Sequence, residues 1–262
     1  MSFTRVTQSG PCPVCRKTDW CRVFADGWVE CMRIQSDRPA KSGGWMHSHG
    51  EGTALPWIPA RVICTPPLMD APHLMRVWLQ ATSAEVVRNF AMELGVSVAS
   101  LKAVGAAWSV PHQAWAFPMR DGLETIVGIR LRNERGKFAV RGSRQGIFTT
   151  TMKPQPTMYV CEGPTDTAAA VDLGLFAVGR PNCCCGGADI REFCRRHAVR
   201  RVVMLSDNDK PGLDGARKVG LEIGLLFAVY VPPAKDLRAY LRLGGTSELI
   251  ANTLRHTVWS QP

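Results

Sequence analysis

The chain has 262 residues, 45% of them apolar, and a formal net charge of +10 from 32 basic and 22 acidic residues. This length accommodates one large domain or two small ones, and the basic balance suits an anionic polymer such as nucleic acid. There is no apolar run long enough to cross a bilayer and no signal-peptide pattern at the polar N-terminus, so we expect a cytoplasmic protein without membrane contact.

Residues 1–50 have the pattern of a small β module stapled by zinc. Cys12 and Cys15 form a CxxC pair, whose geometry lets two thiolates reach one tetrahedral Zn²⁺. Cys21 and Cys31 flank a segment centred on Asp26-Gly27, which predicts a β-hairpin. If Gly27 closes a short turn, these two cysteines lie opposite each other and complete a four-cysteine site.

A competing fourth ligand exists in the same module. His47 follows a turn at Gly43-Gly44, and sites with three cysteines and one histidine are common for zinc. We favour Cys21 as the fourth ligand and keep His47 as the alternate.

A predicted linker and three predicted helices follow the cysteine module. Residues 51–70 are proline-rich and lack periodicity, which predicts a linker. Residues 71–104 carry helical spacing, for example at Leu74, Val77 and Trp78, and Gly95 is expected to end the second of three helices. Core packing explains this helical pattern.

Strand patterns follow from residue 114 to residue 143. Alternation places Arg130 and Arg132 on one face of a strand, with Lys137 and Arg141 of the next strand beside them. A solvated antiparallel face with its charges outward is the alternative interpretation. We assign residues 71–152 to one α+β subdomain.

From residue 156 to residue 235 strands and helices alternate, which predicts a parallel sheet covered on both faces. Glu162 ends one apolar strand, and Asp166 comes about one helical turn later. Asp207 and Asp209 end a second apolar strand before Pro211-Gly212. Carboxylates crowded at such an edge repel one another and require a hard cation, which we expect to be Mg²⁺.

Three consecutive cysteines, Cys183 to Cys185, lie between the short strand and the next helix. Three adjacent side chains do not converge easily on one ion, and no neighbouring histidine would activate a thiolate. We interpret them as small loop residues.

The acidic motifs resemble a known family. Glu-Gly-x-x-Asp at Glu162–Asp166 and Asp-x-Asp-x-Pro-Gly at Asp207–Gly212 resemble the Toprim domain of DnaG-type primases and topoisomerases. Asp236 resembles the further acid that those primases carry after the next strand. The resemblance implies a Toprim domain over residues 153–262 and a catalytic set of Glu162, Asp166, Asp207, Asp209 and Asp236.

Two earlier segments extend the resemblance. Phe117-Pro118-Met119, Val127–Arg130 and Lys137–Ser143 resemble, in order, strands of the N-terminal subdomain of the DnaG catalytic core. The cysteine module resembles the zinc ribbon of DnaG and phage primases, although Ile34 stands where their last ligand would be. The resemblance implies contacts to template and nucleotide phosphates, which we assign to the set Arg130, Arg132, Lys137, Arg141 and Arg180.

The chain is therefore identified as a DnaG-type primase, of a build similar to that of phages and mobile elements. The fold class is α/β: a zinc-ribbon β module, an α+β subdomain and a Toprim parallel sheet. The resemblance implies short RNA primers made on single-stranded DNA from ribonucleoside triphosphates, with Mg²⁺ or Mn²⁺ held by Glu162, Asp207 and Asp209 and Zn²⁺ held by the cysteines. The sequence has no Walker A motif, so a helicase is expected as a separate protein.

Two alternatives stay open on the sequence. The same acids could serve a Toprim-type nuclease with water as the nucleophile. The chain could also be a non-catalytic DNA-binding replication protein that keeps the fold as a scaffold.

Overall fold

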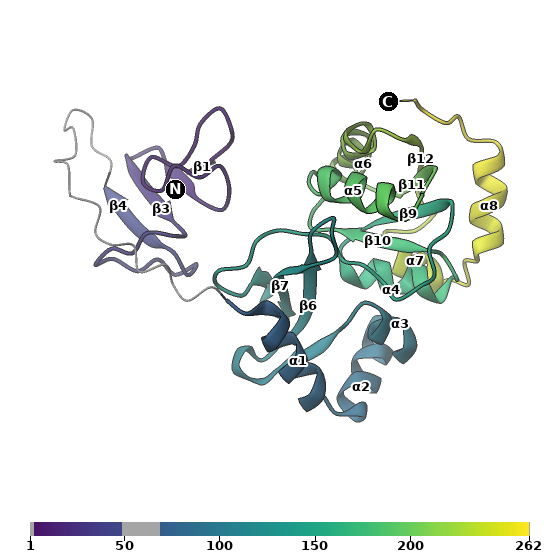
Figure 1. Ribbon diagram of the computed structural model, residues 1–262, viewed down its shortest axis with the longest axis horizontal. Coiled ribbons are helices and arrows are strands. Elements are labelled where there is room, and N and C mark those ends of the chain that lie inside the picture. Colours follow the sequence, from purple (N-terminus) through teal and green to yellow (C-terminus); the bar gives the residue numbers. More distant parts are fainter. Residues whose placement is uncertain (1–2, 49–68, 262) are drawn as a thin grey trace. The chain divides into compact units, whose positions relative to one another are not determined.

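The structure is a computed structural model that describes residues 3–48 and 69–261. The chain divides into two compact units, Met1–Cys64 and Thr65–Pro262 (Figure 1). The predicted linker at residues 51–70 falls almost entirely outside the described residues. The predicted boundary at residue 152 lies inside the second unit, so it stays a prediction.

The first unit is a four-stranded antiparallel sheet in the order β1-β2-β3-β4. Its strands are Phe3–Arg5, Arg22–Phe24, Trp28–Cys31 and Trp45–Ser48. Gly27 connects β2 to β3 with a φ of 81°, a conformation that strongly favours glycine, so the predicted hairpin is confirmed. The buried core is small and consists largely of thiols: Val6, Cys12, Cys21, Val29 and Cys31. The sequence patterns gave no indication of β1 or β4.

The second unit begins with the three helices that helical spacing predicts. They are α1 (Ala71–Ala81), α2 (Ala84–Leu94) and α3 (Val98–Ala103). Asp70, Ser83 and Ser97 accept hydrogen bonds from the first free backbone N–H groups of these helices. Gly95 ends α2 with a φ of 70°, as expected.

An antiparallel sheet follows, in the order β5-β6-β7-β8. Its strands are Ala107–Ser109, Ala114–Arg120, Ile126–Asn133 and Gly136–Ala139. Ile129 and Leu131 of β7 pack fully buried in the core that includes α1, so Arg130 and Arg132 point to the other face. Arg132 lies directly opposite Lys137 of β8, which places these basic residues on one face as predicted.

The last part is a parallel sheet in the order β10-β9-β11-β12. The strands are Thr157–Glu162 (β9), Ala177–Arg180 (β10), Arg201–Leu205 (β11) and Leu226–Tyr230 (β12). The apolar pattern predicts a strand at Leu175–Val178, whereas β10 lies two residues further along the chain, so Arg180 is part of the sheet. The chain order reverses between β9 and β11, and the carboxyl ends of these two strands form the switch point where ligands bind in open α/β sheets.

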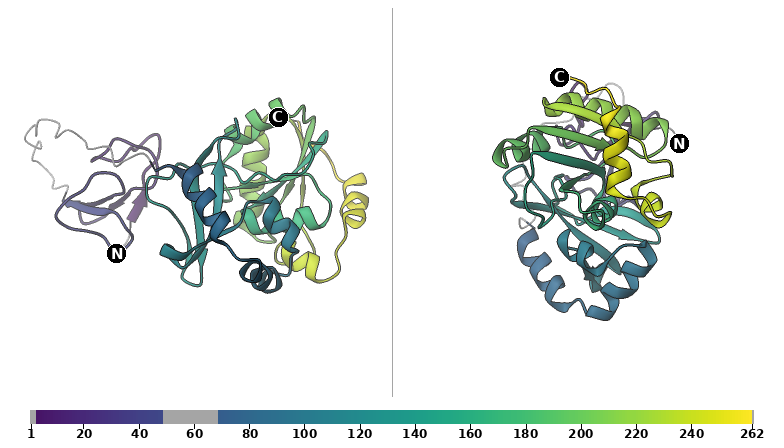
Figure 2. Two further views of the ribbon diagram at one scale, coloured as in Figure 1. Left: turned by 60° about the horizontal axis from the view of Figure 1, so that its bottom comes forward. Right: turned by 90° about the vertical axis from the view of Figure 1, so that its right-hand side faces the viewer.

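Helices cover both faces of the parallel sheet (Figures 1 and 2). Helices α5 (Gly187–Arg196) and α6 (Lys210–Ile223) pack on one face, over alternate residues such as Met158 and Val160. Helices α4 (Pro164–Asp172), α7 (Leu237–Arg242) and α8 (Ser247–Arg255) pack on the other face, over residues such as Cys161. None of the described helices is long and apolar enough to cross a membrane.

The two sheets of the second unit are joined through the segment at Ile147 and Phe148. Ile147 pairs with Arg120 at the end of β6, and Phe148 pairs with Gly179 of β10. Asp172 at the end of α4 links this helix to α3, because its carboxylate accepts hydrogen bonds from the backbone and hydroxyl of Ser97 and from the Ser100 hydroxyl. Helices α1 to α3 lie at the opposite end of this unit from α6 (Figure 2).

Candidate active site

The first acid of the site ends strand β9. Glu162 is followed by Gly163, which has a φ of 85° and lets the chain turn sharply into α4. The neighbouring strand approaches closely here, because a β-carbon at Gly179 would collide with the Gly163 carbonyl and the Thr167 hydroxyl. The Glu162 carboxylate, partly exposed at this edge, lies 3.8 Å from the guanidinium of Arg180.

Two further acids follow strand β11, next to β9. Asp207 is partly buried, while Asp209 is exposed and accepts a hydrogen bond of 2.7 Å from the backbone N–H of Gly212. Asp209 therefore caps α6 and still lies at the edge of the sheet. The predicted pairing of acids from two different strand ends is present in the structure.

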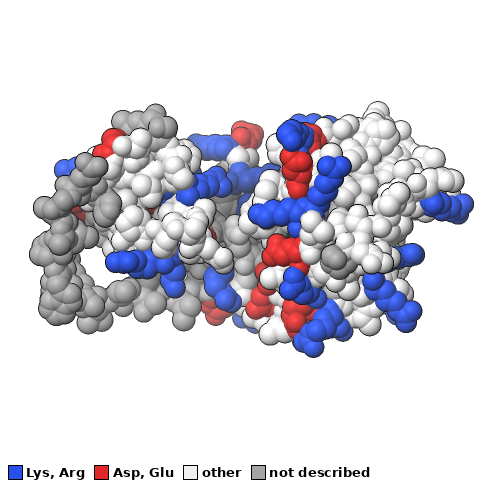
Figure 3. Space-filling view, turned by 90° about the horizontal axis from the view of Figure 1, so that it is seen from above, with Lys and Arg blue, Asp and Glu red and all other residues white. Residues whose placement is uncertain are grey.

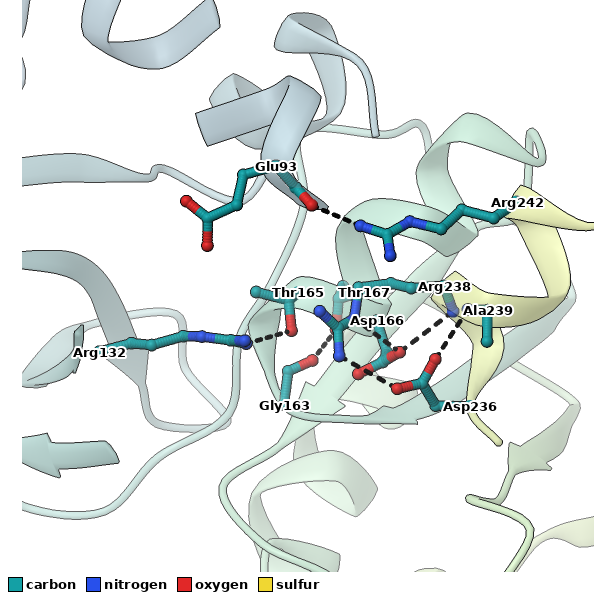
Figure 4. Close-up of polar contacts among 10 residues, drawn as sticks. All are labelled: Glu93, Arg132, Gly163, Thr165, Asp166, Thr167, Asp236, Arg238, Ala239 and Arg242. Carbon is teal, nitrogen blue, oxygen red and sulfur yellow. Dashed lines mark hydrogen bonds and ion pairs between the residues drawn. The ribbon is translucent and has the colours of Figure 1, made fainter. Parts of the chain in front are cut away.

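The remaining acids lie beside these two strand ends and face an arginine that the sequence patterns did not single out (Figure 4). Arg238 of α7 lies 3.3 Å from Asp166 and 3.0 Å from Asp236. Asp236 also caps α7 through the backbone N–H of Ala239 at 2.7 Å. Arg238 comes two residues after Asp236, in the first turn of a helix, and this position is the sequence signal that could have identified it.

The electrostatics of the cluster show that these carboxylates influence one another. Burial, followed by the charges of Glu162, Asp236 and Asp209, raises the pKa of Asp207 to about 6. Burial also raises the pKa of Asp166 to about 6, against the opposing effect of Arg238. A divalent cation that takes oxygen ligands would stabilise the ionised form of these carboxylates at the sheet edge.

The acids are nevertheless not gathered around a single point. In the described part of the chain, the one group of three or more side chains close enough to hold an ion is the cysteine cluster of the first unit. A Mg²⁺ site does not require three side chains around one point, because this ion keeps several waters and uses one or two carboxylates together with substrate phosphates. The donor set of Glu162, Asp207 and Asp209 thus fits that ion chemically.

Basic side chains from the antiparallel sheet face the acids. Arg132 donates a hydrogen bond of 3.1 Å to the hydroxyl of Thr165 in α4, next to Asp166 (Figure 4). Arg130 donates to the carbonyl of Pro181, and the charge of Lys137 acts on Asp207. The alternative of a purely solvated basic face is wrong for Arg130 and Arg132, because both contact the α/β part of the unit.

The other two predicted basic residues differ from this pair. Arg141 is exposed and follows strand β8. Arg180 is fully buried and donates a hydrogen bond of 2.6 Å to the carbonyl of Cys183. Figure 3 shows one face of the second unit, where acidic side chains form a narrow band with basic side chains around it.

The cysteine cluster of the first unit is a separate candidate metal centre. The sulfur atoms of Cys12, Cys15, Cys21 and Cys31 all lie within 4.8 Å of one another. The backbone N–H groups of Met32 and Ile34 donate to the sulfurs of Cys21 and Cys31. These N–H contacts favour thiolates. Hydrogen bonding, first from Cys21, lowers the pKa of Cys31 to about 5, whereas the same hydrogen bond and burial raise the pKa of Cys21, so Cys31 is the thiolate of this pair.

The alternate ligand His47 is not in this group. Its Nε2 lies 3.0 Å from the carbonyl oxygen of Ile34. Four thiols at this spacing suit the tetrahedral coordination that Zn²⁺ adopts in structural sites. The choice of Cys21 as the fourth ligand therefore agrees with the geometry.

Comparisons with known proteins give fold relatives. No protein-family model matches the chain, and the search of curated proteins finds no relative. Among solved structures, the zinc-binding and RNA polymerase domains of the Aquifex aeolicus primase match with a TM-score of 0.59 and 11% identity, over 72% of this chain and 60% of that one. A DnaG primase catalytic domain bound to single-stranded DNA matches with a TM-score of 0.56 and 14% identity, over 72% and 80%.

A phage protein matches over nearly the whole length. The primase fragment of the bacteriophage T7 primase-helicase matches with a TM-score of 0.51 and 16% identity, over 95% of this chain and 99% of that one. These likenesses, at 11–16% identity, show the fold of the chain. The chain has the fold of the DnaG-type primase catalytic core, preceded by a four-cysteine β module.

Proposed function

We propose that this chain is a DNA primase that makes short RNA primers on single-stranded DNA by metal-dependent nucleotidyl transfer. The observation that carries the proposal is the placement of acids from β9 and β11 at the switch point of the parallel sheet, opposite the basic face of the antiparallel sheet. A ligand at this edge meets carboxylates on one side and guanidinium groups on the other, which suits a metal–nucleotide complex.

The acids take different parts in this proposal. Glu162, Asp207 and Asp209 would hold Mg²⁺ or Mn²⁺, and these ions when bound supply a lowered pKa at the attacking 3′-hydroxyl and charge stabilisation at the leaving pyrophosphate. Glu162, the last residue of its strand, is our candidate for a bridging ligand or general base. Asp166 and Asp236 hold Arg238 between them, and the charge of Arg238 opposes the rise in the pKa of Asp166.

The basic residues would bind the anionic substrates. Arg132 and Lys137 lie beside the acids on neighbouring strands, so we assign them to nucleotide or template phosphates. Arg141 follows β8, the strand that contains Lys137, and is exposed. Arg130 is largely buried against Pro181, and we expect it to support the surface rather than to contribute most of the affinity.

The cysteine module would bind Zn²⁺ and help to read the template. Trp45 is buried and serves the small core, whereas Phe3 is 45% exposed with the Arg22 guanidinium 4.8 Å from its ring centroid. Phe24 lies beside Phe3, with ring centroids 5.9 Å apart. Exposed aromatic rings next to arginine are suited to stacking on unpaired bases.

The partners in this proposal are single-stranded DNA, ribonucleoside triphosphates and a separately encoded helicase. The net charge of +10 supports the two anionic partners. A matching structure of a DnaG catalytic domain holds single-stranded DNA, which supports the template class for the same fold.

Primer synthesis by the purified chain tests the proposal. The assay contains single-stranded DNA of mixed sequence, labelled ribonucleotides and Mg²⁺ or Mn²⁺. We expect short RNA products that fall at least about 100-fold with Glu162→Gln and Asp207→Asn. Asp214→Asn is the matched control, because Asp214 is an exposed acid of α6 paired with Lys210 and should leave synthesis unchanged.

Other results would overturn the primase assignment. Degradation of the template by the wild-type chain, lost in the same two variants, would establish the nuclease instead. DNA binding with neither activity, in the presence of a cognate helicase, would establish a scaffold protein.

A further inference from the structure

The loop with three consecutive cysteines, Cys183 to Cys185, is not used in the proposed reaction. It follows β10 directly, beside Glu162, and it precedes α5. Cys184 is exposed, and Cys183 is partly exposed. Their sulfur atoms lie 3.4 Å apart, so the two thiols already face each other.

The peptide unit between these two cysteines is hydrogen-bonded at both ends. The N–H of Cys184 donates to the side-chain oxygen of Asn182 at 3.0 Å. The carbonyl of Cys183 accepts from the Arg180 guanidinium at 2.6 Å. That carbonyl also lies against Gly215 of α6, where any β-carbon would collide with it.

Arg180 connects this peptide to the acids. Its side chain is fully buried, and its Nε and Nη2 atoms have no hydrogen-bond partner in the described part of the chain. Nη2 lies 3.8 Å from the Glu162 carboxylate, which is longer than a hydrogen bond. The Cys183 carbonyl therefore holds the guanidinium at a distance from Glu162.

We propose that Cys183 and Cys184 form a reversible disulfide that controls the position of Glu162 through Arg180. The functional consequence rests on the proposed primase activity, whereas the disulfide itself does not. The oxidant is a low-molecular-weight disulfide such as oxidised glutathione.

The exchange proceeds in two balanced steps. The Cys184 thiolate attacks the glutathione disulfide, forms a mixed disulfide and releases one glutathione thiolate. The Cys183 thiolate then attacks the Cys184 sulfur and releases the second glutathione. Two protein thiols have become one disulfide, and one oxidised glutathione has become two reduced molecules, which take up the two protons.

The bond has a physical consequence for the peptide. Consecutive Cα atoms lie about 3.8 Å apart, below the separation that most disulfides span, so the ring closes only if the connecting peptide reorients. Reorientation takes the Cys183 carbonyl away from Arg180. The buried guanidinium then has Glu162 as its remaining partner, closes on it and withdraws that carboxylate from Asp207 and Asp209, the other two proposed magnesium ligands. A strained disulfide is readily reduced, so the proposed change at Glu162 is reversible.

The experiment uses the full chain in glutathione buffers of increasing oxidised fraction. Mass spectrometry of the loop peptide should show the loss of two hydrogens without a glutathione adduct. Mn²⁺ binding, followed by the electron paramagnetic resonance signal of the free ion, should weaken about tenfold, and primer synthesis should fall with it. Both should return with dithiothreitol, while the zinc content stays constant.

Two variants make the test specific. Cys184→Ser should abolish the disulfide and the response, whereas Cys185→Ser keeps the facing pair and should respond like the wild type. Absence of the loop disulfide, or a disulfide that leaves Mn²⁺ affinity unchanged, would overturn the inference. If Mn²⁺ affinity responds as expected in a chain that makes no primers, the inference stands and the proposed function fails.

Discussion

The two units of this protein place their candidate metal ligands differently: the first buries most of its cysteines, and the second has its acids at the edge of a sheet. In the first unit three of the four clustered cysteines, Cys12, Cys21 and Cys31, are themselves the buried core, with Val6 and Val29 as the apolar additions. In the second unit four apolar clusters pack around the two sheets, and the acids lie at an edge, outside those clusters. A metal is therefore expected to be part of the folding free energy in the first unit and part of the chemistry in the second.

Removal of zinc is the strongest way to test this comparison. We expect a chelator to unfold residues 3–48 while residues 69–261 keep their structure, because a structural zinc contributes about 10 kcal/mol in small modules. Hydrogen exchange followed by mass spectrometry measures the protection of each unit separately. Retained protection of the β2–β3 hairpin in the zinc-free protein would show that the thiols alone suffice.

Arg238→Met should be the most damaging single substitution at the acid cluster. It leaves Asp166 and Asp236 without their shared cation, and breaking such a buried pair costs about 3–5 kcal/mol of unfolding free energy. The measurement is urea denaturation of the second unit. Arg242→Met is the matched control, because Arg242 on the same helix donates only to the Glu93 carbonyl and its loss should cost less.

The penalty of Arg238→Met should also depend on pH. The pKa of Asp166 is raised to about 6 in the folded protein, so keeping it ionised opposes folding increasingly as pH rises from its ordinary value through about 6. Arg238 offsets this effect. The penalty should therefore be larger at pH 8 than at pH 5, and equal penalties would exclude an ionised Asp166.

Asp172→Asn tests the tie between α3 and α4. The substitution weakens charge-assisted hydrogen bonds to Ser97 and Ser100, so we expect a loss of about 1–3 kcal/mol in the urea denaturation of the second unit. Asp189→Asn, which accepts from the Gly122 backbone at 3.1 Å, provides a comparison with a single contact. A smaller loss for Asp172 than for Asp189 would contradict the importance of this tie.

Gly27→Ala should have the smallest effect. A β-carbon at a φ of 81° costs about 1 kcal/mol, and the zinc-bound module should absorb it with a slightly lower melting temperature. Gly10→Ala is the control, because its φ is not in the left-handed region and its β-carbon meets only ordinary contacts. Equal effects of the two substitutions would show that the hairpin turn is not strained.

The sequence determined most of the local elements and the residue types that gather at the two candidate sites. Glu162 ends one apolar strand and Asp207 follows another, so the apolar runs alone place both acids at a sheet edge. Gly27 and Gly95 mark a turn and a helix end because few other residues tolerate their backbone angles. The CxxC pair and the hairpin likewise sufficed to anticipate the cysteine cluster.

Only the tertiary structure decided which of these residues face one another. Arg180 ends a strand that lies two residues further along the chain than its apolar pattern predicts. It donates to the Cys183 carbonyl, with which a β-carbon at Gly215, far along the chain, would collide. Arg238 is an ordinary helix residue in the sequence and becomes the partner of two acids because α7 packs against α4. Strand order and helix packing are set by long-range burial, which local periodicity does not encode.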